Sequence, residues 1–109
     1  MTKSEDPTSA LHSHLRRKNP DGIPIQDAVQ LFVWVYCTLD VLPPQLRKAP
    51  LGRKELVGAF GKLTEDGLII CPEKGEPIPT GGWDAVVQDI LADRVRPDPA
   101  FLARIGSYL

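Results

Sequence analysis

The sequence has few of the residues and segments that mark metal proteins, membrane proteins and secreted proteins. It holds two cysteines and two histidines among 109 residues. Its longest apolar run, Ala28–Leu39, is interrupted by Gln30 and is shorter than the roughly 20 residues that cross a bilayer. The first ten residues are polar and contain no apolar signal core. We therefore expect a soluble, cytoplasmic protein without a membrane association.

The few cysteines and histidines do not form a recognisable ligand set. Cys37 and Cys71 are too far apart for a metal framework, and free thiols are favoured over a disulfide in a cytosolic chain. Cys37 lies in the apolar run and is predicted to pack as a small hydrophobic residue. His12 and His14 could bind a metal, but neighbours two apart on a helix point away from each other and no third ligand is evident. We expect no metal and no cofactor.

Arrangements typical of catalysis are also missing. The chain has no glycine-rich phosphate loop, no Ser/His/Asp order and no Cys/His pair that rises above chance. Its carboxylates are scattered over predicted exposed faces, so none tunes another for acid–base work. The sequence therefore predicts that the protein is not an enzyme.

Charge gives a weak argument about partners. The net charge of −1 removes the simplest reason to expect nucleic-acid binding. Its distribution is uneven, since residues 1–62 hold nine Lys/Arg against six Asp/Glu and residues 63–109 hold four against eight. The basic residues of the first part cluster as Arg16–Lys18, Arg47–Lys48 and Arg53–Lys54.

Periodicity and turn residues predict a chain of helices interrupted by one hairpin. A chain of this length makes one domain that buries roughly 60–70% of its unfolded surface. The predicted helices start at Thr8 or Ser9, at Pro24, at Pro44, at Arg53, at Trp83 and at Pro99. Gly67 is the expected left-handed cap after the helix from Arg53, and Asp98 is the expected cap of the last helix. Helical spacing predicts three apolar faces: Leu11 and Leu15; Leu56, Phe60 and Leu63; and Trp83, Val86, Val87, Ile90 and Leu91. The predicted strands are Leu68–Pro72 and Pro77–Thr80, joined by the reversal Glu73–Glu76.

The helix that begins at Pro24 and runs to Leu39 is apolar nearly all round. Helical spacing places Ala28, Phe32 and Tyr36 on one side of it, and the opposite side is also apolar, with Leu31, Trp34 and Val35. A helix of this kind is buried on two sides, either inside the domain or against a partner subunit.

One phrase carries a family resemblance. The spacing Leu56-x3-Phe60-x2-Leu63-x3-Gly67-Leu68-Ile69, followed by a hairpin and Thr80-Gly-Gly-Trp, resembles bacterial winged helix-turn-helix transcription regulators. The resemblance covers about residues 25–93 and implies a mainly α fold with a small β-hairpin (α+β) and flanking helices at both ends. It divides the chain into a flexible tail and short helix (1–24), a winged-helix domain (25–93) and a C-terminal helix (94–109).

In that family one helix enters the major groove of double-stranded DNA and the wing touches the backbone. The resemblance therefore implies a small transcriptional regulator, acting as a homodimer through Ala28–Leu39 and the C-terminal helices. The residues carried over as DNA contacts are Arg47, Lys48, Arg53, Lys54, Val57, Gly58, Gly61, Lys62 and Lys74. A backbone-tracking arm of Arg16, Arg17 and Lys18 is a further candidate; these cations also suit a plain helix end.

A second interpretation stays open, in which the chain is a winged-helix protein-interaction module or complex subunit that does not read DNA. Gly58 and Gly61 supply no hydrogen bonds for reading bases, where family members usually carry polar side chains. The hairpin reversal, Glu73–Glu76, is net acidic, and an acidic tip is poorly suited to a phosphate.

Overall fold

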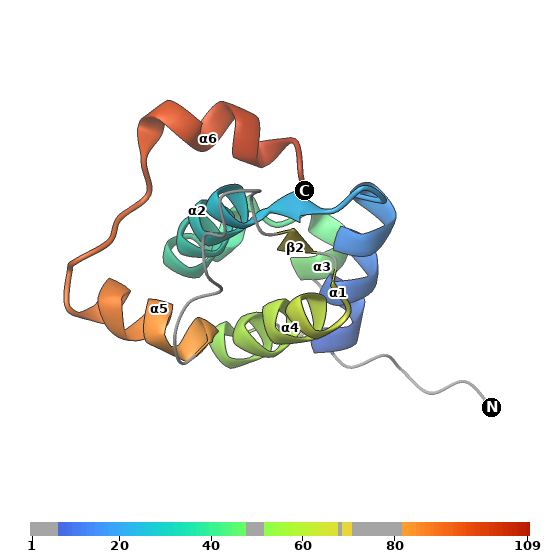
Figure 1. Cartoon of the computed structure of the whole chain (residues 1–109), viewed down its shortest axis with the longest axis horizontal. Helices are drawn as coiled ribbons and strands as arrows, with labels where there is room; N and C mark the ends of the chain where they lie inside the picture. The colour runs from blue at the N-terminus through green and yellow to red at the C-terminus, as the bar shows by residue number, and fades with distance from the viewer. Residues whose placement is uncertain (1–6, 48–51, 68, 71–81) are drawn as a thin grey trace.

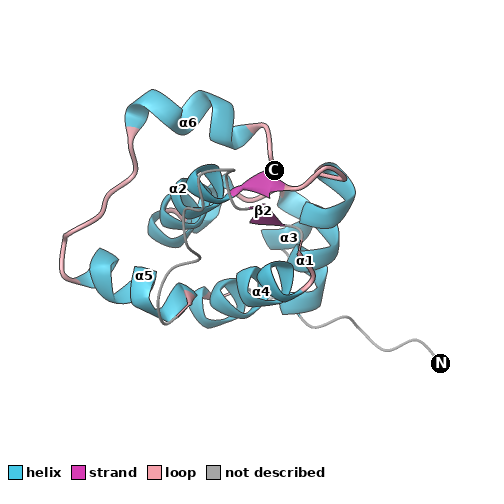
Figure 2. Cartoon of the chain, viewed as in Figure 1, coloured by secondary structure: helices cyan, strands magenta, loops and turns pink. Residues whose placement is uncertain are grey.

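The computed structural model describes residues 7–47, 52–67, 69–70 and 82–109, and its helices surround the central helix α2 (Ile25–Cys37) (Figure 1). The protein is mainly helical, as predicted, with a small β element (Figure 2). The other helices are α1 (Pro7–Lys18), the 3-10 turn η1 (Leu39–Val41), α3 (Pro44–Arg47), α4 (Arg53–Glu65), α5 (Trp83–Leu91) and α6 (Pro99–Gly106). No helix in this described part of the chain is long and apolar enough to span a bilayer.

The β element consists of β1 (Ile23–Pro24) and β2 (Ile69–Ile70), which pair in parallel with Ile23 opposite Ile69. Pro24 holds this segment extended before α2 begins, because proline disfavours helical geometry in the residue before it. β2 lies within the first predicted strand. The rest of the predicted hairpin, including Pro77–Thr80, lies outside the described residues.

The core forms where α2, α4 and α5 meet. Phe32, Phe60 and Trp83 come from these three helices, and each pair of rings has its centroids 5.2 Å apart. Two of the three pairs are edge-to-face, a favourable arrangement for aromatic quadrupoles. The indole nitrogen of Trp83 donates to Thr64 Oγ1 at 2.9 Å, so its polar atom is satisfied inside the junction.

The predicted stripe of α4 is confirmed. Leu56, Phe60 and Leu63 are at most 1% exposed, and α4 is followed by Gly67 at φ +75°. That left-handed conformation is the one expected of a glycine directly after a helix, where a Cβ would be strained. The cap predicted for the last helix is also present, since Asp98 Oδ1 accepts a hydrogen bond from the Ala100 amide at 3.0 Å.

α1 is part of the same core. Leu11 and Leu15 are fully buried, and α1 lies along α4 (Figure 1). The sequence division at residue 24 therefore does not separate two packing units, because α1 fills one side of the domain that residues 25–93 were predicted to form. The spacing of Leu11 and Leu15 had predicted an apolar side without saying what it would cover.

The second side of α2 is covered by α6, which lies across it (Figure 1). Ile105 is fully buried, and Gly106 sits so near Trp34 that a Cβ there would lie 3.4 Å from the indole. The sequence left open whether the second side of this helix is buried inside the domain or against a partner subunit. In the structure it is buried inside the domain, by α6.

The end of α2 differs from the prediction. The helix stops at Cys37 rather than Leu39, because Thr38 leaves helical geometry with φ −142° and Leu39 belongs to η1. Cys37 is a free, exposed thiol, so the prediction that it packs as a small hydrophobic residue is wrong. The buried residues of α2 end at Val35, and Cys37 follows in the last turn beyond the core.

Candidate binding surface

Arg53, at the start of α4, is committed to a contact within the chain. Its Nε donates to the Tyr36 carbonyl at 2.8 Å, and its guanidinium carbon lies 5.3 Å from the centroid of the Tyr36 ring. The last carbonyls of a helix lack partners within that helix and carry partial negative charge, so a cation there stabilises the end of α2. Arg53 therefore joins the end of α2 to the beginning of α4.

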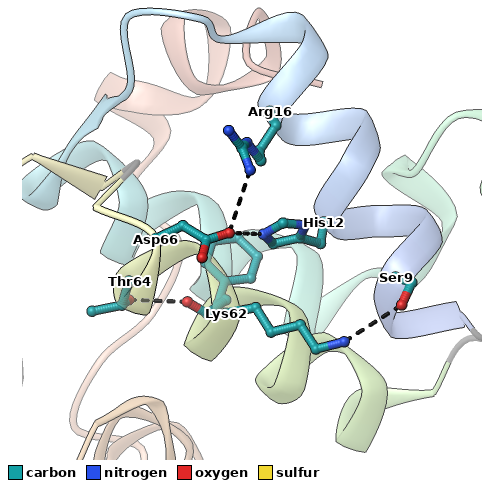
Figure 3. Close-up of polar contacts among 7 residues, drawn as sticks. Ser9, His12, Arg16, Lys62, Thr64 and Asp66 are labelled. Carbon is teal, nitrogen blue, oxygen red and sulfur yellow. Dashed lines mark hydrogen bonds and ion pairs between the residues drawn. The ribbon is translucent and has the colours of Figure 1, made fainter.

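One side of α4 is covered by α1 through a row of polar contacts (Figure 3). Lys62 Nζ donates to Ser9 Oγ at 3.4 Å. Asp66 Oδ2 lies 2.7 Å from His12 Nε2 and 3.5 Å from Arg16 Nη1. At the other end of the row, Thr8 Oγ1 donates to the Glu55 carbonyl at 3.3 Å.

Gly58 lies at the border between this covered side and the open face of α4, where it is still exposed. A Cβ at that position would lie 3.3 Å from the Thr8 side chain, so the glycine permits the close approach of α1. Gly61 differs, because a Cβ there meets no described atom within 4 Å. The two glycines that were predicted to face a groove together therefore have different surroundings.

The open face of α4 carries little that could read bases. Successive residues of a helix are rotated by 100°, so the direction away from Leu56, Ala59, Phe60 and Leu63 is occupied by the following residues. They are Lys54, Gly58, Gly61 and Glu65. This face offers one cation and one carboxylate, and no amide or hydroxyl side chain.

The cations predicted as DNA contacts do not form one patch in the described part of the chain. α1 and α4 run in the same direction, since Thr8 lies by Glu55 while Arg16 lies by Asp66. The exposed Arg17 and Lys18 therefore lie at the opposite end of α4 from Lys54. For Arg47 only the backbone, in α3, is described, and Lys48 and Lys74 lie outside the described residues.

A cleft lies between α2, α4 and α5. Two adjoining hollows of about 300 Å³ and 400 Å³ share Tyr36 and Arg53 in their linings. The first is completed by Lys54, Val57, Asp84 and Val87. The second is completed by Cys37, Ile90 and Leu91. We refer to these nine residues as the α5 cleft.

α5 gives the α5 cleft its apolar wall. Trp83 and Val86 are buried, Val87 and Ile90 are half-buried, and Leu91 is 69% exposed, the one large apolar side chain so exposed in the described part of the chain. The sequence predicted all five as one core face. That prediction holds for the first half of α5 only, because the chain leaves α5 for the far side of α2.

The abrupt end of α5 explains this exposure. Asp93 adopts φ +63°, its amide donates to the Ile90 carbonyl at 3.0 Å, and the Arg94 amide donates to the Asp89 carbonyl at 2.8 Å. These paired bonds around a left-handed residue stop the helix within two residues of Leu91. An aspartate tolerates this conformation better than most residues, but its sequence context gave no signal of it.

Comparison with protein-family models, with curated proteins and with solved structures gave no match. Function is therefore inferred from the residues of the chain itself.

The remaining polar groups of the interior fasten the C-terminal segment. Asp27, 7% exposed, accepts hydrogen bonds from Arg104 Nη2 and the Tyr108 hydroxyl, each at 2.6 Å. Burial and the Asp27 hydrogen bond raise the pKa of Tyr108 to about 12. Each of these groups has a partner, and these hydrogen bonds hold the C-terminal segment against α2.

Each of the two histidines also makes a polar contact between segments that are far apart in the sequence. His14 Nε2 lies 2.6 Å from the Leu109 carbonyl oxygen, whereas His12 pairs with Asp66, the C-cap of α4. The two rings thus have separate partners, and the described residues contain no group of three potential ligands around either ring.

Proposed function

We propose that this protein is a small protein-interaction module, of winged-helix type, that binds a segment of a partner protein in the α5 cleft. The observation that carries the proposal is the apolar wall of α5, where Leu91 is 69% exposed beside the half-buried Val87 and Ile90. Contiguous apolar surface rimmed by polar residues is typical of binding sites.

The order of elements supports the winged-helix part of the proposal. α2, α3 and α4 follow one another before β2, and α5 follows the segment predicted as a wing. The fold places α2, α4 and α5 around the cleft, so the binding surface would be built on helices anchored by the aromatic junction. Sites built on packed helices keep their geometry better than sites on loops.

The cations of α4 favour a protein partner over DNA. Lys62 is hydrogen-bonded to α1, so among the described side chains of α4 only Arg53 and Lys54 remain beside the α5 cleft, and Arg53 already donates to the end of α2. A protein that neutralises several phosphates needs several cations on one face, since most of the non-specific affinity for DNA comes from these contacts.

Selection from a randomised peptide library, displayed on phage and challenged with the immobilised protein, tests the proposal. We expect peptides that bind the wild-type chain and lose at least tenfold in affinity with Leu91→Glu. They should keep their affinity with Ala103→Glu, which places the same charge on an exposed position of α6. Because Leu91 is already exposed, neither substitution buries a charge. Failure to enrich any peptide, or peptides indifferent to Leu91→Glu, would refute the proposal.

DNA binding by a homodimeric regulator remains the second candidate, supported by the resemblance and by the basic start of α4. Titration of the same protein with unrelated duplex DNA separates the two. Affinity that falls steeply between low and moderate salt, and that weakens with Lys54→Ala, would favour the regulator. We expect no such binding.

A further inference from the structure

The rim of the α5 cleft is charged unevenly. Lys54 is exposed and has no partner among the described residues, and Arg53 bonds to a neutral carbonyl rather than to a carboxylate. Both cations lie on the α4 side. Asp84 lies on the α5 side and is likewise without a described partner. The two sides of the cleft therefore carry opposite charge.

Several of the other cations whose side chains the structure describes are already paired with a carboxylate. Arg94, Arg96 and Arg104 pair with Asp89, Asp93 and Asp27, and Arg16 pairs with Asp66. Arg53 and Lys54 stand apart because they adjoin an apolar surface and have no described carboxylate within ion-pair distance. A ligand that covers this surface would bring both cations into a less hydrated environment, where an opposite charge is worth more.

The apolar wall fits a short helix. Val87, Ile90 and Leu91 lie on one side of α5, and the stretch from Asp84 to Leu91 is eight residues, or about 10 Å of helix. Within the described part of the chain, the lining comes from helical side chains of α2, α4 and α5 and not from a strand edge. Grooves of this kind bind amphipathic helices through apolar anchors at i, i+3 or i+4, and i+7.

We infer that the occupant of the α5 cleft is an amphipathic helix of a partner protein whose apolar anchors contact Val87, Ile90 and Leu91 and whose carboxylates face Arg53 and Lys54. The side of this helix toward Asp84 is neutral or basic. Since this occupant presupposes that the cleft binds a partner, the experiment distinguishes failure of the charge preference from failure of the cleft itself.

Two synthetic peptides of about 15 residues serve as probes. Both carry leucine at i, i+3 and i+7, and one has glutamates beside the leucines where the other has lysines. Binding is measured by fluorescence anisotropy at low ionic strength and located by amide chemical-shift changes. We expect the acidic peptide to bind at least tenfold more tightly than the basic one and to shift the amides of α5. Added salt should reduce the difference, because exposed charges are screened.

Charge reversal at Lys54 provides the decisive variant. Lys54→Glu should remove the preference for the acidic peptide, whereas Lys18→Glu, at the exposed end of α1, should leave it unchanged. Equal affinity of the two peptides, both lost with Leu91→Glu, would overturn the acidic occupant while leaving the cleft as a binding site. Absence of any α5 shift with either peptide would overturn both.

Discussion

At the scale of single residues, Asp27 shows how this small domain accommodates a buried charge. The carboxylate is 7% exposed, and Arg104 and Tyr108 satisfy one oxygen each. A buried carboxylate without partners would cost far more than the net gain from a typical hydrogen bond. Both partners come from the C-terminal segment, so this charge makes the docking of α6 a condition for stable packing of α2.

Removal of the Tyr108 hydroxyl tests this dependence. At pH 7 we expect Tyr108→Phe to lower the free energy of unfolding by about 1 kcal/mol, less than a fully buried charged hydrogen bond because Tyr108 is only half-buried. The pKa of Tyr108 is raised to about 12, so its contribution is complete below its unfolded pKa of roughly 10 and is lost as pH rises toward 12.

Urea unfolding at pH 7 and between pH 10 and 12 measures both effects. The difference between wild type and Tyr108→Phe should shrink across that alkaline window. Tyr36→Phe is the matched control, because the Tyr36 hydroxyl has no hydrogen-bond partner in the described part of the chain, and it should change stability little. A Tyr108 contribution that stays constant up to pH 12 would contradict the raised pKa.

Residues at the ends of elements were the hardest to predict. The burial of Leu56, Phe60 and Leu63 followed from helical spacing, because a stripe in mid-helix has a core beside it wherever the helix packs. Cys37 and Leu91 continue such stripes, yet both are exposed at the last residue of their helix. Whether a stripe remains covered there depends on where the chain goes next, which periodicity does not specify.

At the scale of elements, the two glycines of α4 have different surroundings. α1 approaches so closely at Gly58 that the side chain of Thr8 occupies the nearby space, while Gly61 faces open space among the described residues. Glycine in a helix interior is less favourable than alanine by about 0.8–1 kcal/mol, and neither position has a positive φ that would require it.

Alanine at the two positions should therefore have unequal effects. We expect Gly61→Ala to raise the free energy of unfolding by about 0.8 kcal/mol through helix propensity alone. Gly58→Ala should gain less, because its Cβ would lie 3.3 Å from Thr8 and push α1 outward. The double substitution Thr8→Ala with Gly58→Ala relieves that contact. Thermal and urea unfolding of the four proteins measure the differences; equal gains at both glycines would contradict the close approach of α1.

The sequence was informative about the elements and less so about their partners. Gly67 marked the end of α4 and Asp98 the start of α6 because each acts through bonds a few residues away. The α1 cover of α4 depends on contacts between residues more than 40 positions apart, such as Lys62 with Ser9. For that reason a helix face that the family resemblance assigned to DNA contacts is partly covered by another helix.

At the scale of the whole molecule, the cover of α2 decides which surface remains for a partner. α4 and α5 pack on one side and α6 on the other, and Asp27, Trp34 and Ile105 lie in the second contact. The expectation of a homodimer rested on an α2 face that needed a cover. With α6 in that place, the largest exposed apolar side chain in the described part of the chain is Leu91, on α5.

Sedimentation velocity at micromolar concentration tests this distribution of surfaces. We expect a monomer, because α6 already buries the side of α2 that a second copy would need, and because a stable dimer interface buries about 800 Å² per partner, far more than one exposed leucine supplies. Leu91→Glu should sediment like wild type. A dimer that Leu91→Glu dissociates would make a second copy of the chain the occupant of the α5 cleft and would overturn the acidic helix as its partner. A dimer that persists in Leu91→Glu would instead mean that α6 leaves α2 on association, and Tyr108→Phe, which weakens the α6 contact, should then strengthen it.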